Sequence, residues 1–553
     1  MKNFSSLPRI FSFLIFGIIL LIPLFSHSRT FYVSISGDDG NIGSIDKPWF
    51  SLGRSVRRLK GGDSLFVRGG LYREFGISVS INASSSSKVL IKNFNNEIPI
   101  IQGSQSLDNE NDWVNNSGNI WSISISSYDI GNIWHDEKAS QKKYAFEDLH
   151  KQWDFYFDHE KKLLYLYSIK KPTLFSKNLE ACISKVRGQH GCIIQNSSYV
   201  TIEGIVFKYV NSHGIQITNS DNITIKNVVL KYGGGSTLDF FNKVRYGNGI
   251  EIWNSASNIL VEGCKIFSFY DSGLTNQGKN GLQDSIVFNN NTIVNTKCGI
   301  EHWGDSLITI RNIYWTNNLI KDSGDNWAMN EQNVWGGICL SRTPHTTANF
   351  VISKNRLVNC GSEYSIIVRN SKYNKVSNEN VAFRIKQGGN YVIVGNIICS
   401  GPSHGIYISG DFTGIVYNNL VFDQKGSGII IDSHLNKSLI SNNTIANNGN
   451  QDRPNVVANG INDVWEYNIF YSRLSKPIYY SGGVYNVNCS YPYSALSGSS
   501  INANPLFVNI RKNNYDLKQD SPCLIIPTYK QNALLKKKFN FKATNRIGYK
   551  KDF

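Results

Sequence analysis

The chain has 553 residues, a formal net charge of +16 and nine cysteines. It contains no CxxC motif and no Cys/His cluster, which excludes the common structural zinc sites, and beyond residue 30 no stretch is apolar enough to span a membrane. Much of the basic excess lies between Lys530 and Lys551, which indicates either a solvated tail or a surface that meets acidic glycans or an anionic cell surface.

The first residues have the pattern of a secretory signal peptide. Lys2 and Arg9 precede an apolar run over about residues 10–25, and small residues follow it. We therefore predict a signal peptide over residues 1–28 and a secreted or periplasmic mature chain, for which nucleic acid is not an expected partner. An uncleaved membrane anchor is the alternative, but the run is short for a bilayer and contains Pro23.

Residues 29–108 are predicted to form an N-terminal cap and the first coils of a repeat. Their opening, from FYVSISGDDG to SLFVRGGLYRE, predicts a strand, a Gly/Asp loop, an amphipathic helix around Ser51–Leu59, a GGD turn and a second strand. Residues 109–186 are aromatic, alternating and turn-rich, which indicates an inserted antiparallel β module. We expect most of its aromatic side chains to pack in its core; contact with a sugar is the alternative.

Residues 187–510 carry a repeated motif with period-two apolar alternation, and several units follow one another at about 23 to 27 residues, as in a solenoid of strands. Asparagine tolerates a left-handed backbone, and its side-chain amide both donates and accepts hydrogen bonds. We therefore expect a purely structural ladder at one corner of the coils, with roughly 4.8 Å between neighbouring rungs. The asparagines of this motif are Asn291, Asn318, Asn355, Asn396, Asn419, Asn443 and Asn468, and three earlier units have Ile205, Val228 and Cys264 instead.

The two ends of the repeat resemble exported right-handed parallel β-helix proteins of the pectate-lyase-like group. The cap resembles their opening motif, and NPLFVNIRKNNYDLKQDSPCL resembles their terminating coil, so that residues 511–553 are assigned to a terminal coil and basic tail. The resemblance implies an all-β fold: a single-stranded right-handed parallel β-helix of about ten or more coils, with the cap and the inserted antiparallel module. It does not specify function, because this fold hosts lyases, glycoside hydrolases, epimerases and non-catalytic adhesins.

Each coil has a further strand, usually opened by Gly–Ile, whose alternate side chains face outward. Stacking the coils predicts two outward columns. One contains Gln216, Glu251, Thr275, Glu301, Cys339, Ile367, Tyr407 and Ile430; the other contains Thr218, Trp253, Gln277, Trp303, Ser341, Arg369, Ser409 and Asp432.

Glu251 and Glu301 fall two rungs apart in the first column, and Trp253, Gln277 and Trp303 lie beside them in the second. Exposed paired tryptophans indicate a binding site, and indole rings stack on sugar rings. Paired carboxylates supply the acid and the base or nucleophile that cleave a glycosidic bond. The two-rung spacing, roughly 9 to 10 Å between backbones, favours the inverting geometry.

Other residues adjoin this patch. Asp271 ends the turn before the middle strand and is a third candidate carboxylate, so that any two of the three acids are candidates for the working pair. Arg342 and Arg369 fall at the rim or on later rungs, where an arginine binds a substrate carboxylate or sulfate. The insertion at 231–247 is expected to project as a loop that walls the cleft, and His302 is expected to point into the core.

We therefore predict a carbohydrate-active enzyme, a glycoside hydrolase that acts as a monomer on a neutral or acidic polysaccharide or oligosaccharide, without metal or cofactor. The alternatives are a lyase that cleaves a uronic-acid polymer and a non-catalytic glycan-binding surface protein. In the lyases that the fold resembles, the site needs a Lys or Arg base and often calcium. The columns offer Arg369 but no lysine and no dense acidic cluster, which disfavours that alternative.

The cysteines leave two pairings open. Cys182 with Cys192, or Cys489 with Cys523, are candidates for a disulfide in an exported chain. Most of the others fall inside coils, where we expect them to be buried as small apolar residues.

Overall fold

The structure is a computed structural model. It describes residues 28–324, 326–328, 336–341, 348–361, 381–385, 389–409, 412–432, 438–450, 453–460, 462–473, 479–480, 482–492, 500–524 and 546–551. Residues 1–27 of the predicted signal peptide (1–28) and most of the basic tail therefore lie outside the described residues. No helix in the described ranges combines the length and hydropathy needed to cross a membrane.

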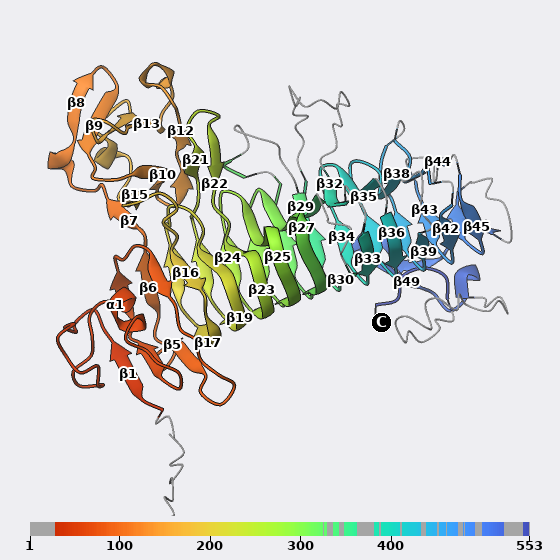
Figure 1. Cartoon of the computed structure of the whole chain (residues 1–553). Coiled ribbons are helices and arrows are strands. Elements are labelled where there is room, and N and C mark those ends of the chain that lie inside the picture. Colours follow the sequence, from red (N-terminus) through yellow and green to blue (C-terminus); the bar gives the residue numbers. More distant parts are fainter. Residues whose placement is uncertain are drawn as a thin grey trace, which may run out of the picture.

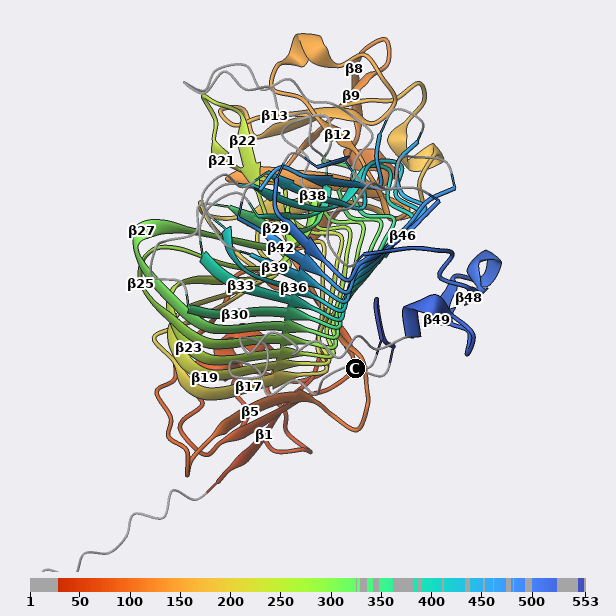
Figure 2. The same ribbon diagram turned by 90° about the vertical axis from the view of Figure 1, so that its right-hand side faces the viewer.

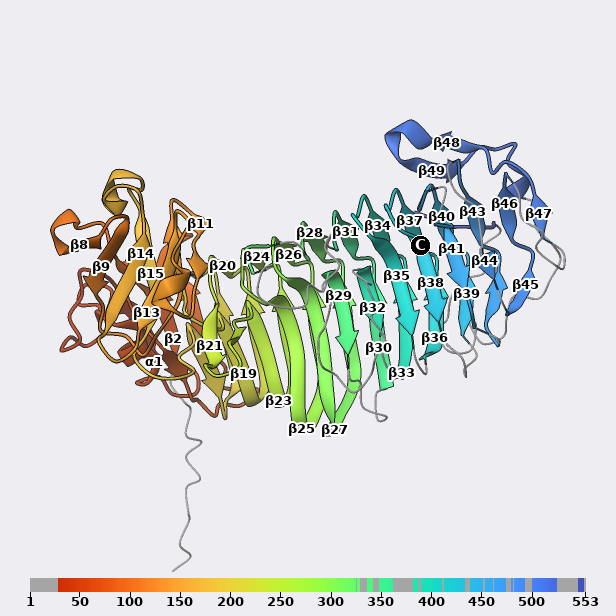
Figure 3. The ribbon, with the colours of Figure 1, turned by 90° about the horizontal axis from the view of Figure 1, so that it is seen from above.

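The chain forms an elongated solenoid of parallel strands, in which successive coils are stacked side by side (Figure 1). Each coil has three faces, and the longest strands, which bend from the first face into the second, join those two faces in one sheet of 22 strands. The third face is a separate sheet of 14 strands, which bears out the predicted number of coils. Figure 2 and Figure 3 show the same stack from its end and from above.

The first face carries the outward columns. Four long strands on this face also run into the second face, and Figure 3 shows three of them, β23, β25 and β27, reaching further than the strands that follow. The strands of the first face are β4 (Ile77–Val79), β16 (Cys192–Gln195), β19 (Ile215–Lys226), β23 (Ile250–Glu262), β25 (Ser272–Asn289), β27 (Cys298–Thr316), β29 (Gly336–Ser341), β32 (Val381–Ile385), β35 (His404–Ser409), β38 (Ile429–Asp432), β41 (Val456–Ala458) and β44 (Tyr479–Tyr480).

The second and third faces consist of shorter strands on either side of the asparagine corner. Additional strands of the second face are β5 (Val89–Asn93), β17 (Ser198–Glu203), β30 (Ala348–Ser353), β33 (Gly389–Val394), β36 (Phe412–Tyr417), β39 (Leu439–Ser441), β42 (Val464–Glu466) and β45 (Val484–Asn486). The third face contains β3 (Gly70–Tyr72), β6 (Pro99–Gln102), β18 (Val206–Lys208), β20 (Val229–Lys231), β24 (Lys265–Phe267), β26 (Thr292–Val294), β28 (Leu319–Lys321), β31 (Arg356–Val358), β34 (Ile397–Cys399), β37 (Leu420–Phe422), β40 (Thr444–Ala446), β43 (Ile469–Tyr471), β46 (Cys489–Tyr491) and β47 (Ile501–Asn502).

Apolar residues stack in register inside the coils. Ile215 pairs with Ile250, which pairs with Leu274, which pairs with Ile300. All four side chains are fully buried. This continuous apolar core is the main source of stability of a solenoid, because each coil buries its inward face only against its neighbours.

The asparagine ladder is confirmed. Asn291 Nδ2 donates to Asn318 Oδ1 at 2.9 Å, the same contact repeats up to Asn468, and Asn488 adds one further rung. The expected left-handed backbone belongs instead to the residue before each ladder position, such as Asn290 (φ 53°). The ladder asparagines are buried, so their side-chain amides supply the hydrogen bonds of the corner from inside the coil.

The cap has the predicted order of elements. β1 (Thr30–Val33) pairs in parallel with β2 (Ser64–Val67), and the helix α1 lies between them. α1 covers only Leu52–Val56, because the chain turns after Val56 and Leu59 reaches the core from that turn.

Two small sheets stand above the N-terminal end of the solenoid and form the inserted module (Figure 1). Aromatic residues such as Trp113, Phe155 and Phe157 are buried in its core. All its strand pairs are antiparallel except β12 with β13. One sheet contains β7 (Ser104–Ser106), β10 (Asp129–His135), β11 (Lys138–Ala139) and β15 (Leu179–Ser184), and the other β8 (Val114–Ser117), β9 (Ile120–Ser124), β12 (Gln141–Lys142), β13 (Asp154–Asp158) and β14 (Leu163–Tyr167).

The insertion at 231–247 is a β-hairpin rather than a loop. β21 (Ser236–Asp239) pairs antiparallel with β22 (Val244–Tyr246), and β21 contacts β10 of the inserted module. At the far end of the chain, β48 (Phe507–Asn509) and β49 (Asn514–Leu517) form a second small hairpin.

The predicted outward columns are correct over the central rungs and wrong at one later rung. The strand that follows β29 is β32, and Cys339 pairs with Arg384, which pairs with Tyr407. Arg384 of β32 therefore occupies the rung predicted for Ile367, and the strand predicted to hold Ile367 and Arg369 is not the one on this rung. Both residues lie outside the described residues.

All nine cysteines are buried and have free thiols, so neither candidate disulfide is formed in the structure. His302 is fully buried, as predicted, and its Nδ1 lies 2.7 Å from the carbonyl oxygen of Asn276.

Candidate active site

A cleft of about 520 Å³ opens on the first face of the solenoid, and the hairpin β21–β22 lines one side of it, as predicted for this insertion. Arg342 and Arg369 lie outside the described residues. The other side chains that the sequence analysis selected all line this cleft: Glu251, Glu301, Asp271, Trp253, Trp303 and Gln277.

The two glutamates lie two rungs apart, with Thr275 of β25 between them in the register. They point away from the core of the solenoid but are covered by neighbouring turns and the hairpin, so that only 3% of Glu251 and 8% of Glu301 is exposed. They are therefore not members of a solvated outer face.

Glu251 is held by three N–H donors. Gln216 Nε2 donates to Glu251 Oε2 at 2.5 Å, Asn248 Nδ2 donates to Oε1 at 3.2 Å, and His213 Nε2 lies 3.1 Å from Oε2. Burial raises the pKa of Glu251, and the amide donors oppose this effect by stabilising the ionised form.

His213 is a neutral donor to Glu251. Its Nδ1 accepts the backbone N–H of Asn248 at 2.9 Å, so the ring proton must sit on Nε2, which faces the carboxylate. Burial lowers the pKa of His213 to about 3. His190 lies beside it, with ring centroids 4.7 Å apart, and burial together with the neighbouring His213 lowers the pKa of His190 to about 3 as well.

Glu301 has one engaged and one free carboxyl oxygen. Ser272 Oγ donates to Oε2 at 2.7 Å and Gln277 Nε2 donates to the same atom at 3.0 Å, while Oε1 has no partner among the described residues. Burial, and after it the neighbouring Asp271 carboxylate, raises the pKa of Glu301 to about 7. Such a group is protonated in a large fraction of molecules at neutral pH, as a general acid must be.

Asp271 is the most exposed of the three acids. Its Oδ1 lies 3.7 Å from Lys297 Nζ, and 24% of its side chain is accessible. Asp271 raises the pKa of both glutamates, whereas Lys297 lowers that of Glu301. Asp271 and Lys297 therefore shift the pKa of Glu301 in opposite directions.

Trp253 and Trp303 are half-buried and pack edge to face. Their ring centroids are 5.7 Å apart and their planes meet at 77°. They therefore form two walls of one corner rather than two parallel platforms, so that a sugar ring stacked on one indole meets the edge of the other.

The sequence analysis missed His213, Asn248, Ser272 and Lys297, which lie just before the outward strands or, for Ser272, at the first position of β25. Three of them stand directly before the Gly that opens the strand, and Lys297 stands two positions before its Gly. That turn position faces the outward column, because Ser272 reaches Glu301 on the following rung. The outward columns contain no lysine, as stated, but Lys297 brings one into the cleft from the turn.

Within the described ranges, no group of three or more His, Cys, Asp or Glu side chains is arranged to hold a metal ion. The calcium expected for a lyase stays a prediction.

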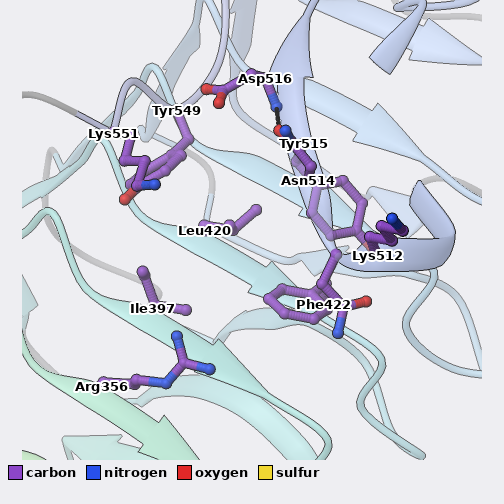
Figure 4. Close-up of a pocket in the computed structure, with 11 residues that line it drawn as sticks. Arg356, Ile397, Leu420, Phe422, Lys512, Asn514, Tyr515, Asp516, Tyr549 and Lys551 are labelled. Carbon is purple, nitrogen blue, oxygen red and sulfur yellow. Dashed lines mark hydrogen bonds between the residues drawn. The ribbon is translucent and has the colours of Figure 1, made fainter. Parts of the chain in front are cut away.

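A second cavity, of about 450 Å³, lies at the other end of the solenoid between its third face and the terminal segments (Figure 4). Basic side chains of Arg356, Lys512 and Lys551 surround an apolar floor that includes Phe422. Among the described residues that line it, Asp516 is the one carboxylate, in contrast to the three acids of the first cleft.

The comparisons with known proteins agree with the fold. A family model described as the right handed beta helix region matches residues 175–330, which include all the residues that line the cleft and bear out the predicted handedness. No curated protein matches the chain in sequence.

Several solved structures are similar to it at low identity. They include the complex of XylC with xylose (12% identity, 86% of this chain, 87% of that chain, TM-score 0.44) and a glycoside hydrolase (10%, 86%, 97%, 0.44). A mannuronic acid specific polysaccharide family 6 lyase from human gut microbiota matches at 10% identity, over 85% of this chain and 88% of that one, with a TM-score of 0.43. Likeness at this level identifies neither a reaction nor a substrate.

Proposed function

We propose that the chain is an exported glycoside hydrolase that cleaves a polysaccharide or oligosaccharide in the cleft of the first face. The observation that carries this proposal is Glu301, a buried carboxyl group with a pKa of about 7 and a free Oε1, two rungs from a second buried carboxylate. Trp253 and Trp303 supply the aromatic corner for a sugar ring.

Glu301 is the proposed general acid. Its Oε2 is anchored by the Ser272 hydroxyl and the Gln277 amide, so the proton sits on Oε1 and passes to the glycosidic oxygen as the bond breaks. A nearby negative charge keeps this proton in place before the reaction, and Asp271 is that charge.

Glu251 is the proposed carboxylate partner. Three N–H donors stabilise its ionised form against the burial that raises its pKa, and in that form it takes a proton from the attacking water while the water oxygen bonds to the anomeric carbon. The two-rung separation leaves room for that water, which supports inversion at the anomeric carbon.

A screen of polysaccharides tests the proposal. We expect the secreted protein to release new reducing ends from at least one of them without any increase in ultraviolet absorbance. A lyase generates an unsaturated product that absorbs, with Lys297 or an arginine as its base, and a non-catalytic glycan-binding protein retains the polysaccharide uncut. Either result contradicts the hydrolase proposal.

The pH dependence of the reaction is controlled by Asp271 and Lys297 in opposite directions. The acid must be protonated, so kcat/KM is expected to fall as the pH rises through about 7, the pKa of Glu301. Asp271→Asn removes a charge that raises this pKa and should move the alkaline limb to lower pH; Lys297→Met removes a charge that lowers it and should move the limb to higher pH.

The two substitutions are matched controls for each other. The measurement is the full pH profile of kcat/KM for each variant. Shifts in the same direction, or no shift, contradict the assignment of Glu301 as the titrating acid. Complete loss of activity in Asp271→Asn at every pH would identify Asp271, and not Glu251, as the base.

A further inference from the structure

A further hollow adjoins the catalytic cleft at its hairpin wall. A second hollow of about 510 Å³ shares Arg187, Leu238 and Val244 with the catalytic cleft, so the two spaces adjoin at these three residues. Its remaining lining comes from the tip of the hairpin and from Tyr128 of the inserted module. A substrate that extends from the carboxylates in this direction therefore lies between residues of the hairpin and of the inserted module.

Two aromatic rings line the second hollow. Phe240 and Tyr128 have ring centroids 6.4 Å apart, and His159 lies edge-on to Phe240 at 4.6 Å. Phe240 remains 41% exposed despite these contacts. Leu238 (46% exposed) and Tyr128 (36%) line the same hollow, so the three side chains form an exposed apolar patch, which indicates a binding surface.

The inserted module fixes the hairpin that carries Phe240. Asp129 Oδ2 of β10 accepts the backbone N–H of Thr237 at 2.7 Å, and Arg245 of β22 donates to the carbonyl oxygen of Gly131 at 2.7 Å. Both contacts are buried. The hairpin tip is therefore preorganised, and a ligand stacked on it does not have to order a mobile segment.

We propose that the second hollow is a distal sugar-binding site, so that the substrate is a chain of several sugars rather than a disaccharide. In this arrangement one sugar ring stacks on Phe240 and Tyr128, the Arg187 guanidinium donates to oxygen atoms of the sugar at the junction, and the scissile bond lies between Glu251 and Glu301. This inference rests on the proposed hydrolase function and adds the length of the substrate to it.

The neighbouring Phe241 provides a matched control. It belongs to the same hairpin tip, is 91% exposed and lines neither hollow. Phe240→Ala should raise KM for a hexasaccharide of the cleaved polysaccharide about tenfold, the loss expected for one aromatic stacking contact, and leave kcat/KM for the disaccharide unchanged. Phe241→Ala should change neither, and unchanged disaccharide cleavage in Phe240→Ala shows that its catalytic cleft is intact.

Calorimetric binding of the same two oligosaccharides to Glu301→Gln, with and without Phe240→Ala, measures the distal site without turnover. Equal affinity of Glu301→Gln for the disaccharide and hexasaccharide, or an equal loss in Phe240→Ala and Phe241→Ala, overturns the distal site while leaving the hydrolase proposal in place. A wild-type protein that cleaves no glycan is the separate failure of the proposed function.

Discussion

Glu301→Gln is expected to lower kcat by a factor on the order of 10² to 10⁴ without unfolding the protein, the usual contribution of a general acid. The amide has nearly the same shape as the protonated carboxyl group and keeps an oxygen that accepts from Ser272 and Gln277. What it lacks is a proton that can pass to the leaving sugar. The loss should be measured on the natural polysaccharide, with the melting temperature as the check on folding.

The dependence on the leaving group makes this prediction specific. An aryl glycoside whose phenol leaves without protonation should retain much more of its activity in Glu301→Gln than the polysaccharide does, because it does not need the acid. Glu251→Gln is the matched control, since it should slow both substrates to a similar extent. Equal losses on both substrates for Glu301→Gln contradict its role as the acid.

Lys142→Met is expected to destabilise the inserted module by about 3–5 kcal/mol, the usual effect of removing one partner of a buried ion pair. Lys142 Nζ lies 2.8 Å from Asp129 Oδ1 and also donates to Thr237 Oγ1 at 2.9 Å, and both charged side chains are buried. Without the lysine, Asp129 becomes an unpaired charge in the contact between β10 and the hairpin.

Scanning calorimetry at a fixed scan rate checks this prediction through the melting temperature of the first transition. Lys143→Met is the control, because the neighbouring Lys143 is partly exposed in its longer 3.5 Å ion pair with Asp154, whose carboxylate also accepts the backbone N–H of His150 and Lys151, so it should cost less stability than Lys142→Met. Although burial acts to raise it, Lys142 holds the pKa of Asp129 below its ordinary value. The stability due to this pair is therefore present above about pH 3.9 and lost as the pH falls through the lower folded pKa.

In Lys142→Met, by contrast, acid should restore part of the stability, since a protonated Asp129 is no longer a buried charge. A melting temperature equal to that of Lys143→Met at neutral pH contradicts the view that this ion pair fixes the hairpin to the module.

The solenoid was predictable because its pattern is local and repeated. Period-two apolar residues and the Asn column give the strand, its inward face and the stacking register, which placed Glu251, Thr275 and Glu301 in one column. Extending the same repeat register past β29 predicted the wrong strand for the rung of Arg369. A long insertion carries no period, and the sheet resumes at β32 instead.

The chemistry of the site was less predictable, because it depends on contacts between segments far apart in the chain. A column assignment shows that Glu251 points away from the core, but not that His213 donates to it or that a hairpin covers it. The residue before each Gly–Ile opening carried that signal, since the turn faces the outward column. The raised pKa of Glu301 follows from burial and from Asp271, neither of which has a sequence pattern.

Cleavage in water enriched in heavy oxygen tests the central claim most directly. A hydrolase with Glu301 as acid and Glu251 as base adds one water oxygen to each new reducing end, so mass spectrometry should find one heavy oxygen atom per cleavage, formed far more slowly by Glu301→Gln. Products without the heavy isotope, or labelled products formed at the wild-type rate by Glu301→Gln, would contradict this account.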